Sequence, residues 1–361
     1  MTPRFLALPA VVVVLAPLLA WAQGSTPPAP SPLLDRMLLE AAREGHTNAA
    51  GQLLAQGADA NARGDSGLTA LMTASVNGHA LIVRRLLEHG ADTAAREPRY
   101  GASALTIAAR RGHFDIAVAL LERGGGANSA ETRTGMTTLA LAAGSGSAEL
   151  VTELLARGAD VTTTAEDGFT ALMGGAVGGS DAAVQLLIDA GAAVDGSRRD
   201  GATAFFLAAE AGNAMIVRRL ARAGARRDIV TADGLTPLGR AVARGDAATA
   251  AVLIEAGISP DSPERGETPL MHAVKRGDDR MVELLLTAKA GVNAVSEPEG
   301  HTALMLAANR GLSPLVERLI AAGADANIQA RDGWTAAAAA EMIGEDELAA
   351  RLRRSSQRTT P

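Results

Sequence analysis

Apolar and polar residues follow each other along the chain in short helical patterns separated by glycine-containing turns, and residues 65–92 show one complete unit. The unit opens with a turn signal at residues 65–67 (Asp-Ser-Gly), because glycine adopts the positive φ that tight turns require. A short helix follows, and Gly78 ends it. A second helix places four apolar residues at helical spacing within residues 82–87. The pattern predicts turn, short helix, turn and longer helix, and neither helix is long enough to be stable alone in water.

This unit recurs along most of the chain, and its opening glycine marks the period. The intervals between successive opening glycines are 32 to 34 residues, and the glycines are Gly67, Gly101, Gly135, Gly168, Gly201, Gly234, Gly266, Gly300 and Gly333. A fixed period near 33 residues is typical of a stacked array in which each unit buries its apolar face against its neighbours. The period therefore favours a helical solenoid with a binding role over a globule with a central active site.

Two segments match a known repeat closely. They are residues 265–286 (RGETPLMHAVKRGDDRMVELLL) and residues 299–327 (EGHTALMLAANRGLSPLVERLIAAGADAN). Both resemble the ankyrin repeat, whose signature runs D-x-x-G-x-T-P-L-H-x-A-A-x-x-G-H, then an I-V-x-L-L helix, then G-A-D-x-N. The resemblance covers about residues 33–352 and implies an all-α ankyrin-repeat solenoid of stacked helix-turn-helix units with β-turn or hairpin fingers. It also implies that a partner protein binds on a concave face formed by the turn tips and the exposed side of the first helix.

The array is expected to have irregular ends and a tail. The predicted parts are a truncated first repeat (33–64), eight full repeats (about 65–330), a truncated last repeat (331–352) and a disordered basic tail (353–361). The histidine that follows T-P-L in the ankyrin signature is missing from every repeat. This departure puts the stability of individual repeats in question, but not the fold.

Composition indicates which residue types form the core and excludes some classes of function. The chain of 361 residues is 47% hydrophobic but only 2% aromatic, so its core must be built mainly from alanine, leucine and valine. A formal net charge of −6 argues against general nucleic-acid binding, which usually requires a basic surface. The absence of cysteine excludes disulfides and thiolate metal sites.

The N-terminus has the pattern of a signal peptide at residues 1–22. Arg4 gives a positive start, residues 5–19 are almost wholly apolar, and Ala-Trp-Ala ends the segment with the small-x-small cleavage pattern. The apolar run contains two prolines and is shorter than the ~20 residues of a membrane-spanning helix. We therefore expect cleavage, a Pro/Ser linker at residues 23–32 and a bacterial protein that is periplasmic or secreted. An N-terminal segment that stays uncleaved as an anchor is the alternative.

Residues suited to catalysis are scarce. Three of the six histidines, His46, His79 and His113, follow the glycine between two helices, a place that the ankyrin family uses structurally. His89 precedes a helix-ending glycine, where a cation suits the helix dipole. His272 and His301 lie outside these positions and have no plausible acid or nucleophile beside them. Neither lysine follows a phosphate-binding glycine loop, and metal-ligand clusters are missing. The sequence therefore predicts no enzyme activity, no metal and no cofactor.

The first candidate set for partner binding is the residue directly after each opening glycine. Five of these nine residues are large and apolar, namely Leu68, Met136, Phe169, Leu235 and Trp334. Two interpretations are open. The residues form a row of hydrophobic anchors for a partner protein, or they pack between adjacent turns.

The second candidate set is the residue pair before the glycine between the two helices. Basic residues gather there in the second repeat and again in the sixth to eighth: Arg110, Arg111, Arg244, Lys275, Arg276 and Arg310. On an acidic chain they form a local positive stripe, which predicts a partner with an acidic surface. The alternative is an ordinary solvated helix end, where cations suit the helix dipole.

One repeat departs from good helix-forming composition. Residues 170–180 read TALMGGAVGGS, with Gly174 and Gly175 inside the predicted first helix. Each glycine costs about 1 kcal/mol relative to alanine in a helix interior. The propensities therefore predict a weak point near the centre of the array.

Three functions agree with these features. The leading hypothesis is a non-enzymatic protein-protein interaction scaffold, exported from the cytoplasm and monomeric. The first alternative is a secreted effector that binds host proteins, and the second is an accessory that stabilises a periplasmic enzyme. Ankyrin repeats bind unrelated targets, so the fold does not name the partner.

Overall fold

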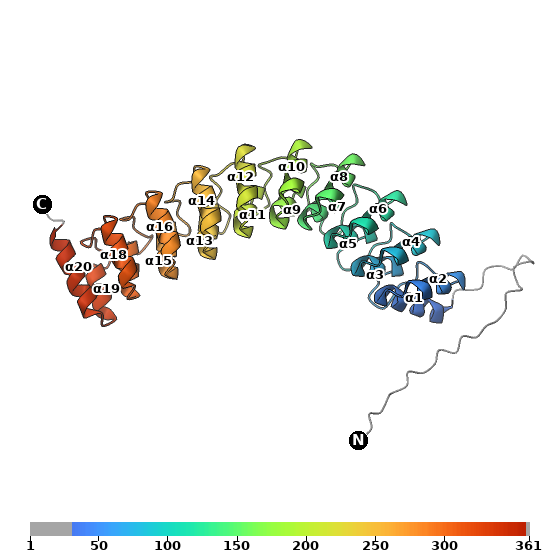
Figure 1. Cartoon of the computed structure of the whole chain (residues 1–361), viewed down its shortest axis with the longest axis horizontal. Helices are drawn as coiled ribbons and strands as arrows, with labels where there is room; N and C mark the ends of the chain where they lie inside the picture. The colour runs from blue at the N-terminus through green and yellow to red at the C-terminus, as the bar shows by residue number, and fades with distance from the viewer. Residues whose placement is uncertain (1–30, 359–361) are drawn as a thin grey trace, which may run out of the picture.

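The computed structural model describes residues 31–358, and the regular structure of these residues is ten consecutive pairs of α-helices. The pairs stand side by side along an arc, with the N-terminal pair at one end and the C-terminal pair at the other (Figure 1). The first helices of the pairs are α1 (Pro32–Glu44), α3 (Ala70–Asn77), α5 (Ala104–Arg111), α7 (Thr138–Gly144), α9 (Ala171–Gly178), α11 (Ala204–Ala211), α13 (Pro237–Arg244), α15 (Pro269–Arg276), α17 (Ala303–Asn309) and α19 (Ala336–Met342). The second helices are α2 (Thr47–Ala55), α4 (Ala80–Glu88), α6 (Phe114–Glu122), α8 (Ala148–Ala156), α10 (Asp181–Asp189), α12 (Ala214–Arg222), α14 (Ala247–Glu255), α16 (Asp279–Thr287), α18 (Ser313–Ala321) and α20 (Asp346–Arg358). The predicted all-α solenoid is confirmed.

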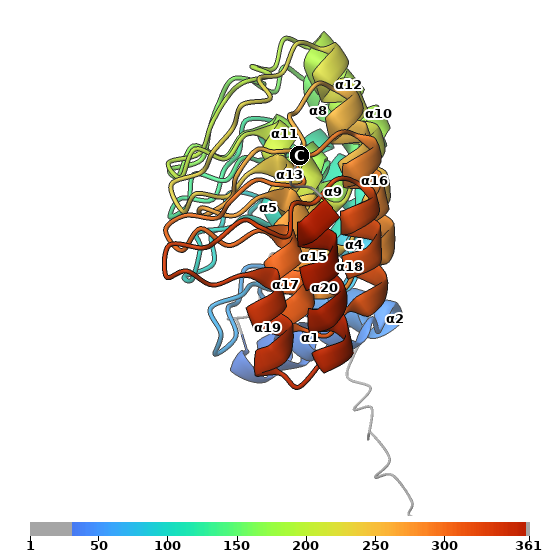
Figure 2. The same ribbon diagram turned by 90° about the vertical axis from the view of Figure 1, so that its left-hand side faces the viewer.

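The segments that link each second helix to the next first helix project together from the array, and we call them fingers. Figure 2 shows the fingers on one side and the second helices on the other. Isolated antiparallel bridges close five of the fingers: Arg63 with Thr69, Ala130 with Thr137, Ser197 with Thr203, Glu264 with Glu267, and Val295 with Thr302. The expected hairpin fingers are therefore present as turns with single bridges.

Serine and threonine caps explain where the first helices begin. From α3 to α19, the residue before each first helix is a serine or threonine whose hydroxyl oxygen accepts a hydrogen bond from the backbone N–H three residues later. In α3 the Met72 N–H donates to Thr69 Oγ1 at 3.2 Å. Gly78 then ends the helix with a φ of 79°, a conformation that favours glycine.

The position of the missing ankyrin histidine is filled by core residues. Met72 occupies it in α3 and is 1% exposed. In α13 the same position is Gly239, and the buried carboxylate of Glu264 occupies the space that a side chain there would need. Glu264 Oε2 accepts a hydrogen bond from the Thr236 N–H at 3.2 Å. The repeats therefore keep their caps without the histidine.

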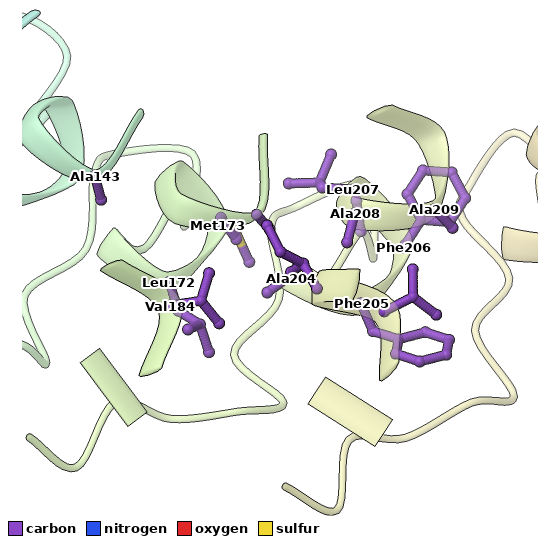
Figure 3. Close-up of a cluster of buried hydrophobic side chains, with 14 of the residues drawn as sticks. Ala143, Leu172, Met173, Val184, Ala204, Phe205, Phe206, Leu207, Ala208 and Ala209 are labelled. Carbon is purple, nitrogen blue, oxygen red and sulfur yellow. The ribbon is translucent and has the colours of Figure 1, made fainter. Parts of the chain in front are cut away.

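The core is a continuous row of small and branched apolar side chains between the first and second helices, as the composition predicts. Figure 3 shows part of it, with Leu172 and Val184 of the fourth repeat near Phe205 and Ala208 of the fifth. All four side chains are at most 1% exposed. Because each pair covers the face of the next, burial is distributed along the array.

Asparagine side chains tie several neighbouring repeats together at the ends of the second helices. Asn128, which follows α6, donates to the carbonyl oxygen of Gly158 at 3.1 Å and accepts from the Asp160 N–H at 2.7 Å, both beyond α8. Asn61 and Asn293 make the same two kinds of hydrogen bond to the next repeat. The G-A-D-x-N motif is thus a bridge between repeats.

The two ends of the array differ from the prediction. Pro32, assigned to the linker, opens α1, where its fixed φ suits the first helical turn. The expectation of disorder from residue 353 is wrong for residues 353–358, because α20 continues to Arg358. Leu352 is buried against the array, and Arg353 forms an ion pair with Glu341 of α19. The predicted signal peptide and residues 23–30 of the linker lie outside the described residues.

The glycines of the fourth repeat allow close packing between α7 and α9. A Cβ at residue 174 would clash with the backbone carbonyl oxygen of Ala140, and one at residue 178 would lie 2.5 Å from that of Ala143. Gly144, on the facing helix, lies opposite Gly174. These glycines therefore permit a backbone contact that larger side chains would prevent, and the predicted weak point at this repeat stays a prediction.

We expect Gly174→Ala to destabilise the protein, although alanine is the better helix former. The clash with α7 should lower the free energy of unfolding by about 1–3 kcal/mol, as overpacking does. Urea unfolding measures this change. Gly51→Ala in α2 is the control, because a Cβ there meets only the flexible Arg85 side chain, and it should be neutral or stabilising. Equal stabilisation by both variants would contradict the close-packing account.

We also expect Asn128→Ala to lower the free energy of unfolding, by about 1–2 kcal/mol, because two hydrogen bonds between repeats are lost. Asn48→Ala removes an exposed asparagine of α2 and should change stability by no more than about 0.5 kcal/mol. Thermal unfolding of both variants measures the change. An unchanged unfolding midpoint for Asn128→Ala would show that the bridge does not stabilise the array.

Candidate partner-binding surface

The short turns that join the first and second helix of each pair form one edge of the array, which we call the turn edge. Consecutive first helices pack on each other along the array, so their C-terminal ends line up, and these turns face the inside of the arc (Figures 1 and 2). The residue after a turn glycine packs on the preceding turn: the His79 ring lies against Gly45, and the His113 ring against Gly78. These two histidines therefore have the structural placement that the sequence predicts.

All six residues of the predicted basic stripe lie on the turn edge with exposed side chains: Arg110, Arg111, Arg244, Lys275, Arg276 and Arg310. Three of them already have partners. Arg110 forms an ion pair with the buried carboxylate of Glu131, and Lys275 forms one with Glu267. Arg310 donates to the carbonyl oxygen of Lys275 near the end of α15, as the helix-end interpretation expects.

The other three members of the stripe carry the accessible charge. Arg111, Arg244 and Arg276 make no ion pair with any carboxylate in residues 31–358. The guanidinium groups of Arg244 and Arg276 lie over the glycines of the preceding turns, Gly212 and Gly245, and the carboxylates of Asp246 and Asp278 lie over the same two glycines.

The predicted apolar row lies at the base of the fingers, and its side chains are half-buried. Leu68, Met136, Phe169, Leu235 and Trp334 all pack against the core. Their backbone also closes the fingers, because in each case the carbonyl oxygen accepts a hydrogen bond from an N–H across the finger, at 2.8–3.0 Å. The Trp334 ring packs on His301 of the previous finger with the centroids 5.1 Å apart. Packing between adjacent turns is thus observed, and a role as partner anchors stays a prediction.

The tip of the second finger is an exposed aromatic and basic site that the sequence analysis missed. Tyr100 is 41% exposed, and the Arg99 guanidinium carbon lies 5.0 Å from the centroid of its ring. The Arg133 N–H donates to the Tyr100 carbonyl oxygen at 3.1 Å, which joins this tip to the next one. The available signal was that Tyr100 is the chain's single tyrosine and directly precedes an opening glycine.

A buried carboxylate holds this finger tip in place. Glu97 is 9% exposed and accepts hydrogen bonds from the backbone N–H groups of Arg99, Tyr100 and Ala102 at 2.6–3.1 Å. Burial acts to raise the pKa of Glu97, but the backbone N–H donors outweigh it and lower that pKa below the ordinary value. The charged carboxylate therefore keeps Tyr100 at the tip.

Other kinds of site find little support within residues 31–358. The His, Asp and Glu side chains there form no cluster of three or more that could hold a metal ion. The helices of this part of the chain are too short or too polar to cross a membrane. Hollows do occur between neighbouring second helices, for example one of about 320 Å³ between α4 and α6.

Comparison with known proteins gives matches along most of the array. The family model described as "Ankyrin repeats (3 copies)" matches residues 38–132, 118–198, 138–226, 176–264, 205–296 and 259–330. A segment of 58 residues, 16% of this chain, is 47% identical to the mitochondrial disaggregase of Bos taurus. That segment spans only 9% of the length of this relative.

The lowered pKa of Glu97 makes the second finger sensitive to acid. Such a carboxyl contributes stability above its unfolded pKa of about 4.3, and this contribution is lost as the pH falls through the folded pKa. We therefore expect Glu97→Gln to lower the unfolding midpoint at about pH 7, and we expect this difference from the wild type to become smaller as the pH falls from about 5 towards 3. Glu166→Gln, at an exposed position of another finger, should match the wild type at both pH values. Equal stability of Glu97→Gln and wild type at neutral pH would contradict the role of Glu97.

Proposed function

Since the chain belongs to the ankyrin-repeat family, we propose that it is a scaffold that binds a partner protein along its fingers and turn edge. Ankyrin repeats mediate protein-protein interaction, and this array offers ten helix pairs in one continuous row. The observation that carries the proposal is the set of three exposed arginines without carboxylate partners on the turn edge, Arg111, Arg244 and Arg276.

The partner surface that fits this edge is acidic. Exposed cations on the rim of an interface attract an oppositely charged partner and raise the association rate. The chain as a whole has a net charge of −6, so these arginines are local positive charges on an acidic protein. Tyr100 and Arg99 at the second finger tip add an exposed aromatic ring with a cation beside it, and aromatic residues are enriched in interface cores.

Export from the cytoplasm forms part of the proposal. It rests on the sequence pattern of residues 1–22, with a positive start, an apolar run and a small-x-small end. The partner is then a periplasmic or extracellular protein. The family is typically a scaffold without catalytic activity, and the proposed function requires none.

The experiment is affinity purification from envelope extract with the mature chain as bait, followed by affinity measurement on the captured protein. We expect Arg244→Glu together with Arg276→Glu to weaken binding at least about tenfold and to reduce its dependence on salt. The fluorescence of Trp334, which is half-buried in the last finger, gives a second readout near the C-terminal end.

The matched control is Arg84→Glu together with Arg123→Glu, which makes the same change in net charge on the second helices. These two arginines line the hollow between α4 and α6, away from the turn edge. The control should bind like the wild type. If both double variants bind equally well, the turn edge is not the partner surface.

A further inference from the structure

A hollow of about 460 Å³ is lined by residues of α12, of the segment after it and of α14. Both helices are second helices, which stand on the side of the array away from the fingers (Figure 2). Three arginines line it, Arg218 and Arg222 from α12 and Arg227 from the following segment. Glu255 of α14 is the carboxylate of the lining, and Val252 contributes to an apolar floor. Three positive charges and one negative charge leave the lining with a net charge of +2.

The hollow between α4 and α6 lies at the equivalent place in the array and has a different charge. Its lining residues Arg84 and Glu88 stand at the same distances before the helix-ending glycine as Arg218 and Arg222 do in α12. With Glu122 and Arg123, that lining holds two positive and two negative charges. The position of Glu88 is therefore where α12 reverses the charge.

The two hollows also differ in volume and in one lining side chain. Leu87 lines the first, and Ala221 takes its place in the second. The volume is about 320 Å³ in the first and about 460 Å³ in the second. Both volumes lie in the lower part of the range of small-ligand pockets, so the charge of the lining is what distinguishes the two hollows.

Two of the three arginines of the α12–α14 hollow are held in place by contacts, and the charge of the three is only partly neutralised. Arg218 forms an ion pair with Glu255 at 3.0 Å, and Arg227 donates to the Ala221 carbonyl oxygen at 3.3 Å. Arg222 is exposed and makes no ion pair or side-chain hydrogen bond with any residue of 31–358. A helix dipole contributes only about half a charge at its C-terminus, so three arginines exceed what the end of α12 needs.

Arg219, the next arginine on α12, contacts the neighbouring helix on the other side, α10. Arg219 binds both carboxylate oxygens of Asp181 and the side-chain oxygen of Gln185, all on α10. This pair fixes α12 against α10 with its charges matched. Arg218 and Arg222 also line the hollow between α10 and α12, where Asp181 lies, so the unpaired charge of Arg222 is open to the hollows on both sides of α12, and Arg227 adds its charge on the α14 side alone.

We propose that the hollow between α12 and α14 binds a phosphomonoester group. A phosphomonoester carries close to two negative charges near neutral pH and three strong acceptor oxygens, which match a net charge of +2 and guanidinium donors. The apolar floor at Ala221 and Val252 accepts the carbon skeleton that bears the phosphate. The group belongs either to a soluble molecule or to a lipid headgroup, and the two sources share this chemistry.

The test uses the mature chain and two kinds of probe. Calorimetry with inorganic phosphate and glycerol 3-phosphate tests soluble ligands, with acetate at equal ionic strength as the monoanion control. Co-sedimentation with phosphatidylcholine vesicles, with and without phosphatidic acid, tests the lipid source. We expect binding in at least one arm, and weaker binding of acetate than of phosphate. Absence of binding in both arms, or equal binding of acetate, overturns the proposal.

Variants locate the binding in the hollow. Arg222→Glu gives α12 the charge pattern of α4, and with Arg227→Ala it should weaken phosphomonoester binding at least about tenfold. Arg84→Ala with Arg123→Ala, in the charge-balanced hollow, should leave it unchanged. Unfolding midpoints without ligand confirm that all variants fold. Equal weakening by both pairs overturns the proposal, because it shows a general charge effect, and neither pair alters the turn edge that the proposed function requires.

Discussion

Every part of this molecule depends on the burial of short helices against their neighbours. The first helices beyond α1 have seven or eight residues and the second helices before α20 have nine, fewer than an isolated helix needs to persist in water. Each pair is stabilised only when the next pair covers it, so the threonine caps, the helix-ending glycines and the asparagine bridges all act on a fold whose stability is shared. The candidate binding surfaces depend on the same stacking, because it holds the fingers and turns in register.

The fold was readable from the sequence because it rests on local signals that repeat. The opening glycines, the capping threonines and the helical spacing of residues 82–87 each predict an element without knowledge of the rest. The sequence is less informative where contacts between repeats act together with local preference. Gly174 looks like a defect by propensity alone, and only the position of the Ala140 carbonyl oxygen shows what the missing side chain permits. At the C-terminus the polar residues of α20 suggested disorder, but burial of Leu352 extends the helix.

The candidate surface was less predictable from the sequence, because it too depends on contacts between repeats. The spacing of the basic residues placed Arg244 and Arg276 on one edge, and the structure puts them there. Spacing could not reveal which charges are matched, since Glu131 reaches Arg110 from a finger. Tyr100 was overlooked because a single residue has no period. The outer hollow combines side chains of two repeats, and its charge emerges only when α12 and α14 lie side by side.

The side-chain bridges between repeats are not spaced evenly along the array. The asparagines and aspartates at residues 61, 128, 195, 261, 293 and 327 accept or donate hydrogen bonds to the following repeat, whereas the corresponding residues Ala94, Thr162 and Asp228 make no such bond in the described part of the chain. The junctions α4–α6, α8–α10 and α12–α14 therefore depend on other contacts. Arg123 donates to the Leu87 carbonyl oxygen across the first junction, the glycines of α7 and α9 are in close contact beside the second, and Arg218 pairs with Glu255 across the third. A ligand in the arginine-lined hollow would add one more contact across the third junction, so its binding would couple the two repeats there.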